Sequence, residues 1–151
     1  MSHLIEKKNI VLKDSVESWE EALTLSCQPL IDHGYVEEKY LEAIFKSTEE
    51  HGPYYVLAPE IAMPHANPKD GVLQQQISLL VLKEPIKFSE TGFDVRLVFT
   101  LAAIDSESHL ASLTRLATLF ADEEMIQHLI QKTSVEDVFA LLNQMKEEDY
   151  E

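Results

Sequence analysis

The sequence predicts a single α/β domain in which helices flank both faces of a mixed β-sheet. Three runs rich in β-branched and aromatic residues are typical of strands, and they span residues 54–57, 77–82 and 95–103. The two longer runs are almost continuously apolar, as expected for strands that are covered on both faces. The dozen residues between these two runs include Pro85 and Gly92 and are too few for a helical crossover. Some neighbouring strands should therefore be antiparallel, which makes the sheet mixed.

One domain over residues 1–151 is the natural expectation for a chain of this length. Apolar residues make up 45% of the sequence and charged residues 26%, close to the usage of ordinary globular domains. The four glycines occur singly, and no internal repeat or Gly/Ser-rich linker divides the chain.

Two amphipathic helices precede the first predicted strand. The first begins at Ser18, where the next three residues complete a capping-box pattern, and it ends near Gly34. The second spans about residues 37–50 and ends at Gly52-Pro53. Each helix has one apolar face and needs a surface to cover, which the predicted sheet provides.

Three more helices are predicted after the last strand. The first has apolar residues at helical spacing from Leu110 to Phe120, with His109 in its first turn. The other two span about residues 123–131 and 135–146. Together with the two N-terminal helices they complete the helical layers of the α/β fold.

The net charge argues against two classes of partner. Twelve basic and 27 acidic residues give a formal charge of −15, so the average surface repels nucleic-acid phosphates and anionic lipid. The N-terminus lacks the apolar run of a signal peptide, and no stretch approaches the roughly 20 apolar residues of a membrane helix. We therefore expect a cytoplasmic protein with no nucleic-acid partner and no direct membrane insertion.

The sequence offers little support for metal or cofactor chemistry. Cys27 is the single cysteine, and its segment has helical periodicity, so we expect a buried thiol. The scattered histidines lack metal-ligand spacing: His3, His33, His51 and His128. No Walker loop, G-x-G-x-x-G or G-x-S-x-G motif occurs. We expect no metal and no cofactor.

One histidine, His65, lies in an unusually rigid setting. Three prolines surround it within ten residues, at positions 59, 64 and 68. Pro64 has a fixed φ and disfavours the α region at Met63, so His65 should be presented from an extended backbone. A neutral imidazole can act as a nucleophile toward a phosphoryl group. An ordinary loop histidine beside a turn is the alternative that spacing alone leaves open.

The segment Ala62-Met63-Pro64-His65-Ala66, preceded by Leu57-Ala58 and Ile61, resembles the active-site signature of type-2 IIA components of the sugar phosphotransferase system, the mannitol/fructose family. The resemblance implies that His65 accepts phosphate from the phosphocarrier protein HPr and passes it to a IIB component. The donor would thus be a protein, and an acidic surface can attract a basic docking face.

A second feature of the family is a histidine that enters a helix after a long apolar strand. The segment in which the apolar run 95–103 leads to His109 resembles it. This resemblance implies that His109 borders the phosphoryl site. Physically, an imidazole N–H near a helix start adds a donor where the helix dipole already favours an anion. The alternative is that His109 merely caps its helix. Asp105 and Glu107 flank it, and they either orient its ring or favour the helix dipole.

The chain departs from the family in one respect. Many sugar-type members have an arginine near the position sixteen residues before the histidine, where this chain has Thr48 and Glu49, with Lys46 nearby. Whether Glu49 or Lys46 takes over that role is left open. The run from Glu50 to His65 resembles most the ascorbate-specific branch, which implies L-ascorbate as the transported substrate. The alternative is a regulatory, nitrogen-type module whose phosphorylation state is read by a protein partner.

Overall fold

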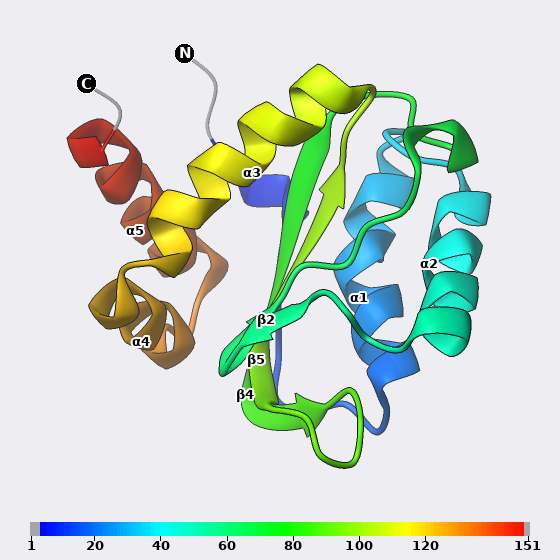
Figure 1. Ribbon diagram of the computed structural model, residues 1–151. Helices are drawn as coiled ribbons and strands as arrows, with labels where there is room; N and C mark the ends of the chain where they lie inside the picture. Colours follow the sequence, from blue (N-terminus) through cyan, green and yellow to red (C-terminus); the bar gives the residue numbers. More distant parts are fainter. Residues whose placement is uncertain (1–3, 150–151) are drawn as a thin grey trace.

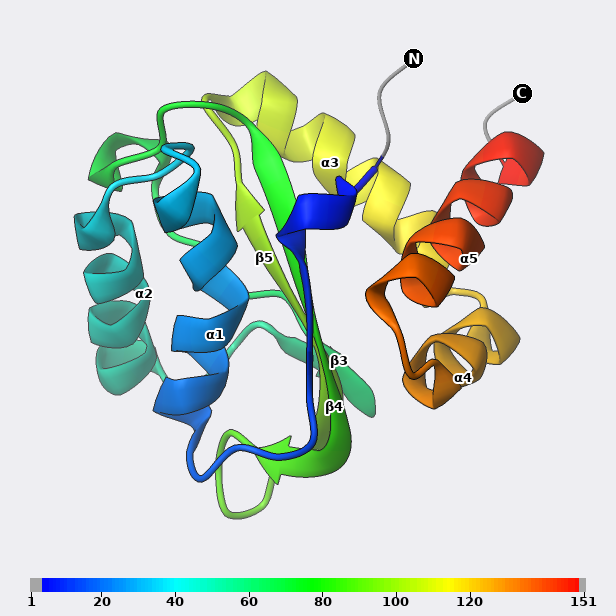
Figure 2. The same ribbon diagram turned by 180° about the vertical axis from the view of Figure 1, so that it is seen from behind.

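The computed structural model describes residues 4–149 and shows three layers, with a sheet between two groups of helices (Figure 1). One face of the sheet is covered by α1 (Trp19–Asp32) and α2 (Glu38–His51). The opposite face is covered by α3 (Ser106–Phe120), α4 (Glu123–Gln131) and α5 (Val135–Asp149), as the view from behind also shows (Figure 2). The predicted single α/β domain with helices on both faces is confirmed.

In the described part of the chain, the sheet contains five strands in the order β1-β4-β5-β3-β2. Their bounds are β1 Ile10–Lys13, β2 Val56–Ala58, β3 Glu60–Ala62, β4 Gln76–Lys87 and β5 Asp94–Ala102, and short 3-10 turns occur at Lys7–Asn9 and Pro68–Asp70. The β1–β4 and β3–β5 pairs are parallel, whereas β4–β5 and β2–β3 are antiparallel. The sheet is therefore mixed, as the short connection between β4 and β5 predicts.

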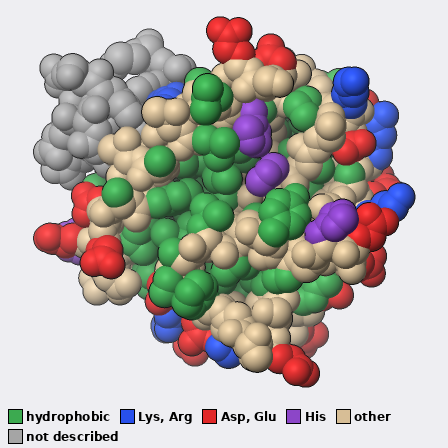
Figure 3. Space-filling view, viewed as in Figure 1, with side chains coloured by type: hydrophobic (Ala, Val, Ile, Leu, Met, Phe, Trp, Pro, Cys, Tyr) green, Lys and Arg blue, Asp and Glu red, His purple; other side chains and the backbone are tan. Residues whose placement is uncertain are grey.

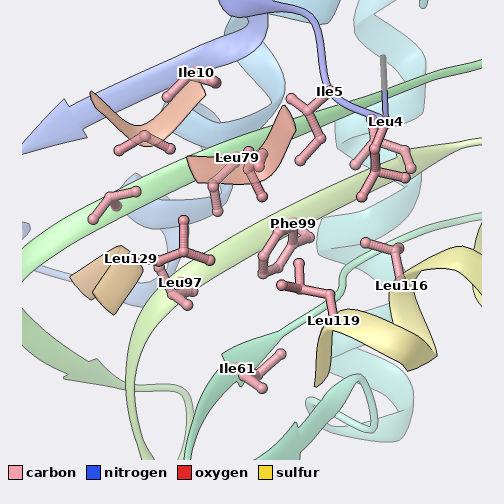
Figure 4. Close-up of a cluster of buried hydrophobic side chains, with 14 of the residues drawn as sticks. Leu4, Ile5, Ile10, Ile61, Leu79, Leu97, Phe99, Leu116, Leu119 and Leu129 are labelled. Carbon is pink, nitrogen blue, oxygen red and sulfur yellow. The ribbon is translucent and has the colours of Figure 1, made fainter. Parts of the chain in front are cut away.

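Alternating side chains of the central strands build two cores. On one face Leu79 of β4 and Phe99 of β5 pack with residues of α3, α4 and α5 (Figure 4). On the other face Leu80 and Val98 pack with residues of α1 and α2. Burial on both faces explains why these strands appear in the sequence as almost continuous apolar runs.

Local interactions define the two N-terminal helices. The Ser18 hydroxyl accepts a hydrogen bond of 3.1 Å from the backbone N–H of Glu21, whose carboxylate accepts one of 2.8 Å from the N–H of Glu17. Gly34 and Gly52 follow α1 and α2 with a φ of +76°, a conformation that suits glycine. Both predicted helices are confirmed.

The structure corrects the N-terminal part of the predicted sheet. The sequence did not predict strand β1, because its four residues are too few to show a strand period. The predicted strand over residues 54–57 is instead the start of a hairpin, in which Pro59 joins β2 to β3 and Glu60 begins β3. A proline followed by a residue with positive φ, here +76° at Glu60, is typical of a type II turn. Arg96 of β5 anchors this turn through an ion pair of 2.5 Å with the Glu60 carboxylate.

Between residues 4 and 149, no helix combines the length and the apolar character needed to cross a membrane.

Candidate active site

His65 lies in an irregular segment that follows β3 and runs beside the end of β5. The carbonyl of Pro64 accepts a hydrogen bond of 3.1 Å from the N–H of Leu101 in β5. The extended setting predicted from the prolines is therefore tied to the central sheet, and it presents a half-buried imidazole.

The tautomer of His65 follows from one hydrogen bond. Its Nδ1 atom lies 2.9 Å from the carbonyl oxygen of Met63. Because a carbonyl oxygen can only accept, Nδ1 carries the proton in the neutral ring. The free lone pair is therefore on Nε2, which is the atom available as a nucleophile.

His109 lies beside His65, as the resemblance implies. The two ring centroids are 5.2 Å apart and the ring planes differ by 58°. His109 belongs to the first turn of α3, but it does not cap the helix. The cap is Asp105, whose carboxylate accepts a hydrogen bond of 2.8 Å from the N–H of Ser108. The capping alternative for His109 is therefore wrong, and Asp105 acts on the helix end.

Burial and the neighbouring imidazole disfavour protonation of His109. The pKa of His109 is lowered from its ordinary value of 6.5, first by burial and then by the nearby charge of His65 when that ring is protonated. The pKa of the Asp105 carboxyl is also lowered, mainly by its hydrogen bond from the N–H of Ser108, so Asp105 stays ionised as the helix cap.

Both histidines line one cavity of about 510 Å³. Its walls come from α2, the turn before β2, the loop after β3 and the start of α3, and they include Ser47, Tyr54, Asn67 and Ser106. Histidine side chains lie among apolar ones near the middle of this face (Figure 3). A second cavity of about 540 Å³ lies where β1 and α4 end, near Lys13 and Lys132, and it contains no histidine. The second cavity therefore lacks the imidazole nucleophile that the first contains.

Tyr54 is a site residue that the sequence did not indicate. Its ring meets the His65 ring edge to face, with centroids 5.9 Å apart. Its hydroxyl lies 3.4 Å from the carbonyl of His65 and 3.4 Å from the hydroxyl of Ser47. In the sequence Tyr54 looked like a strand residue, so only the tertiary structure shows this contact.

The missing arginine has no basic replacement among the described residues that line the histidine cavity. Lys46 and Glu49 are exposed and do not contribute to its walls, whereas Ser47 does. The cavity instead offers the ring of His109, and it borders the N-terminus of α3, where the Asp105 carboxylate already caps the helix. Among the side chains that the structure describes, no group of three or more His, Cys, Asp or Glu is placed to hold a metal ion. The arrangement can thus bind an anionic group and attack it through Nε2.

Comparison with known proteins shows to which family the chain belongs. Residues 3–145 match the family model described as phosphoenolpyruvate-dependent sugar phosphotransferase system, EIIA 2. The chain belongs to this family. It is a IIA component, a phosphoryl carrier of the phosphotransferase system (PTS), as the resemblance in its sequence implies.

Two relatives from Escherichia coli (strain K12) are each 35% identical to this IIA component. The mannitol-specific cryptic phosphotransferase enzyme IIA component aligns over 134 residues, which are 89% of this chain and 91% of the relative. The ascorbate-specific PTS system EIIA component aligns over 142 residues, 93% of this chain and 92% of the relative. Because both relatives are equally identical to this chain, sequence identity does not decide between ascorbate and mannitol as the transported substrate.

Solved structures share the fold. The complex of enzyme IIAMtl and phosphorylated enzyme IIBMtl from Escherichia coli contains a chain with a TM-score of 0.80 and 31% identity, covering 93% of this chain and 97% of that one. Nitrogen regulatory protein IIA-Ntr from Neisseria meningitidis has a TM-score of 0.75 and covers 92% of this chain and 96% of its own. Its identity is 24%, so this likeness shows the fold alone.

Proposed function

We propose that His65 carries the phosphoryl group, accepting it from phosphorylated HPr and passing it to a IIB component. The observation that supports this most is the hydrogen bond between His65 Nδ1 and the carbonyl of Met63, because it leaves the lone pair on Nε2. Nε2 forms a new P–N bond while the P–N bond of the donor phosphohistidine breaks, and the bonding electron pair returns to the donor ring. The proton stays on Nδ1 throughout and is donated in the hydrogen bond to the Met63 carbonyl.

In this proposal His109 stabilises the transferred group without bonding to it covalently. Its ring lies 5.2 Å from that of His65, measured between centroids, so a ring N–H can reach an oxygen of a phosphoryl group on Nε2. The N-terminus of α3 favours the same negative charge. Donors held in place in this way act mainly on the charge that develops during transfer.

The surface around the cavity suits a protein donor and a protein acceptor. Tyr54, Ile104 and Leu110 are 49%, 50% and 65% exposed although they are large apolar residues. Apolar side chains surround histidines on this face (Figure 3). An exposed apolar patch of this kind marks a docking surface. We propose that HPr and a IIB component use it in turn, in the cytoplasm.

L-ascorbate is the substrate that we propose for the transport system. The support is the resemblance of residues 50–65 to the ascorbate-specific branch, together with the relative from that branch at 35% identity. Mannitol is the competing substrate, because a mannitol-specific relative is equally similar. Deleting the gene should abolish growth on L-ascorbate and leave growth on mannitol and fructose intact. Loss of growth on mannitol alone would reverse the assignment.

Transfer onward from the phosphorylated protein tests the carrier function. The protein is labelled with phosphoenolpyruvate, enzyme I and HPr, separated from them, and mixed with purified IIB of the ascorbate or the mannitol system. We expect the label to move to a IIB protein, and to the ascorbate one faster. A label on His65 that stays in place with every IIB protein would support the regulatory alternative.

A further inference from the structure

The parallel pairing of β3 with β5 continues in a modified form beyond the end of β3. In that pairing Ala62 lies opposite Val98, so the same register places His65 opposite Leu101. A residue in a parallel ladder donates its N–H to the residue before its partner and accepts from the residue after it. Leu101 makes the first of these bonds, donating to the carbonyl of Pro64 at 3.1 Å.

The second bond of the ladder is replaced by a side chain. The N–H of Ala66 should donate to the carbonyl of Leu101, but it donates to the hydroxyl of Tyr40 at 3.0 Å. The Tyr40 hydroxyl in turn donates to the carbonyl of Leu101 at 2.5 Å. One oxygen atom from α2 is therefore inserted between the two strands immediately after His65.

The inserted hydroxyl is well suited to a fixed structural bridge. Tyr40 is completely buried, and burial raises its pKa far above the ordinary value, so the hydroxyl keeps the proton that it donates. The hydroxyl accepts from the N–H of Ala66 and donates to the nearer of two carbonyls, that of Leu101; the Ala66 carbonyl is 3.4 Å away. A direct Ala66–Leu101 bond would instead draw the two backbones together.

The insertion affects the geometry of both histidines. Ile61 and Met63 face the core beneath α3, and strand alternation directs His65 to the same face. His109 is connected to Leu101 through the short segment 102–105 and the first turn of α3. Tyr40 thus holds the backbone beside His65 at a set distance from the strand end that leads to His109.

We propose that Tyr40 is a positioning residue for phosphoryl transfer. By inserting its hydroxyl into the β3–β5 ladder, it fixes the position of His65 Nε2 relative to His109. This inference rests on the proposed function of His65. A displacement of about 1 Å at a reacting centre can cost on the order of 100-fold in rate. The hydroxyl should therefore matter for the rate of transfer and not for docking of the donor, because it is buried beneath the cavity.

Tyr55 offers a matched control. It is 1% exposed, and its hydroxyl forms a buried hydrogen bond of 2.7 Å with Thr48 of α2. Removing this hydroxyl also breaks a buried bond to α2, but it leaves the Ala66–Tyr40–Leu101 bridge in place. Both variants should fold, and Tyr40→Phe should lose more thermal stability because it leaves two backbone groups unpaired; calorimetry checks this.

The test is single-turnover transfer from phosphorylated HPr, measured over a range of donor concentrations. For Tyr40→Phe we expect the maximal rate to fall by about 10- to 100-fold with an unchanged half-saturating donor concentration, whereas Tyr55→Phe stays within about twofold of wild type. Equal maximal rates in the two variants, or a change confined to half-saturation, would overturn the proposal. Wild-type protein that takes no label on His65 would instead refute the function on which the proposal rests.

Nuclear magnetic resonance of the wild type keeps the proposal testable should Tyr40→Phe not fold. The bridge requires a slowly exchanging Tyr40 hydroxyl proton close to the amide proton of Ala66. We expect a nuclear Overhauser effect between these two protons. Its absence from a spectrum in which both protons are observed would exclude the inserted hydroxyl.

Discussion

The rings of His65 and His109 lie with their centroids 5.2 Å apart, although the two residues belong to segments that are far apart in the sequence. His65 follows β3, and His109 enters α3 after β5, the strand that pairs in parallel with β3. Neighbouring parallel strands end at the same edge of a sheet, so the topology itself brings the two side chains together. This pairing has consequences for acid sensitivity, for the rate of transfer and for the stability of α3.

The first consequence concerns pH. Because the pKa of His109 in the folded protein is lowered below 6.5, the unfolded chain binds the proton more readily. The contribution of neutral His109 to stability should be complete above pH 6.5 and should be lost as the pH falls through the lower folded-state pKa. Urea unfolding at pH values on both sides of about 6.5 measures this. We expect His109→Gln to lose less stability on acidification than wild type, and equal losses would contradict the assignment.

Replacing His109 tests its supporting role. His109→Ala removes one donor to the phosphoryl oxygens but keeps the nucleophile. If the donor resembles one in an oxyanion hole, transfer to His65 should slow by roughly 100- to 1,000-fold and remain detectable. Rapid-quench labelling with phosphorylated HPr measures the rate. Complete loss of labelling in a folded variant would contradict a merely supporting role for His109.

The helix cap next to the site should act on stability and on transfer together. Asp105→Ala removes the N-cap of α3 and should lower the free energy of unfolding. Asp122 caps α4 in the same way, accepting from the N–H of Met125 at 3.0 Å, and Asp122→Ala is the matched control. We expect both variants to lose similar stability in urea but only Asp105→Ala to transfer more slowly. Equal rates would show that the position of α3 is not limiting.

The sequence predicted the parts of the fold that have long, regular patterns. The two amphipathic N-terminal helices and the apolar strands β4 and β5 are confirmed because burial on defined faces imposes a clear period. Strands of three or four residues, such as β1 and β3, have no measurable period, and their positions depend on pairing with β4 and β5.

The site residues also divide into those that the sequence indicates and those that only the folded structure shows. The prolines and the family resemblance pointed to His65 and His109, and the structure places their rings together. Tyr40 and Tyr54 carried no sequence signal. Tyr40 lies 26 positions from Ala66 and 61 from Leu101, so only the folded chain shows that its hydroxyl joins them. Local sequence can indicate a nucleophile, whereas the groups that position it come from distant segments.

Charge should influence the encounter with the donor. The formal charge of −15 attracts a basic docking face, and this attraction is screened by salt. The screening length falls from about 30 Å at 0.01 M to about 8 Å at 0.15 M ionic strength. We expect the half-saturating concentration of phosphorylated HPr to rise over this range while the maximal rate stays constant. A half-saturating concentration that does not change with salt would show that electrostatic attraction does not contribute to binding of the donor.

Labelling of His65→Ala most directly tests the claim that His65 is the phosphoryl carrier. Wild type, His65→Ala and His51→Ala are incubated with phosphoenolpyruvate, enzyme I and HPr, and the bound phosphoryl group is located by mass spectrometry. His51 is exposed at the end of α2 and serves as the control. We expect one acid-labile phosphoryl group on His65 in wild type and in His51→Ala, and none in a folded His65→Ala. A phosphoryl group on His109 in wild type, or normal labelling of His65→Ala, would contradict the assignment.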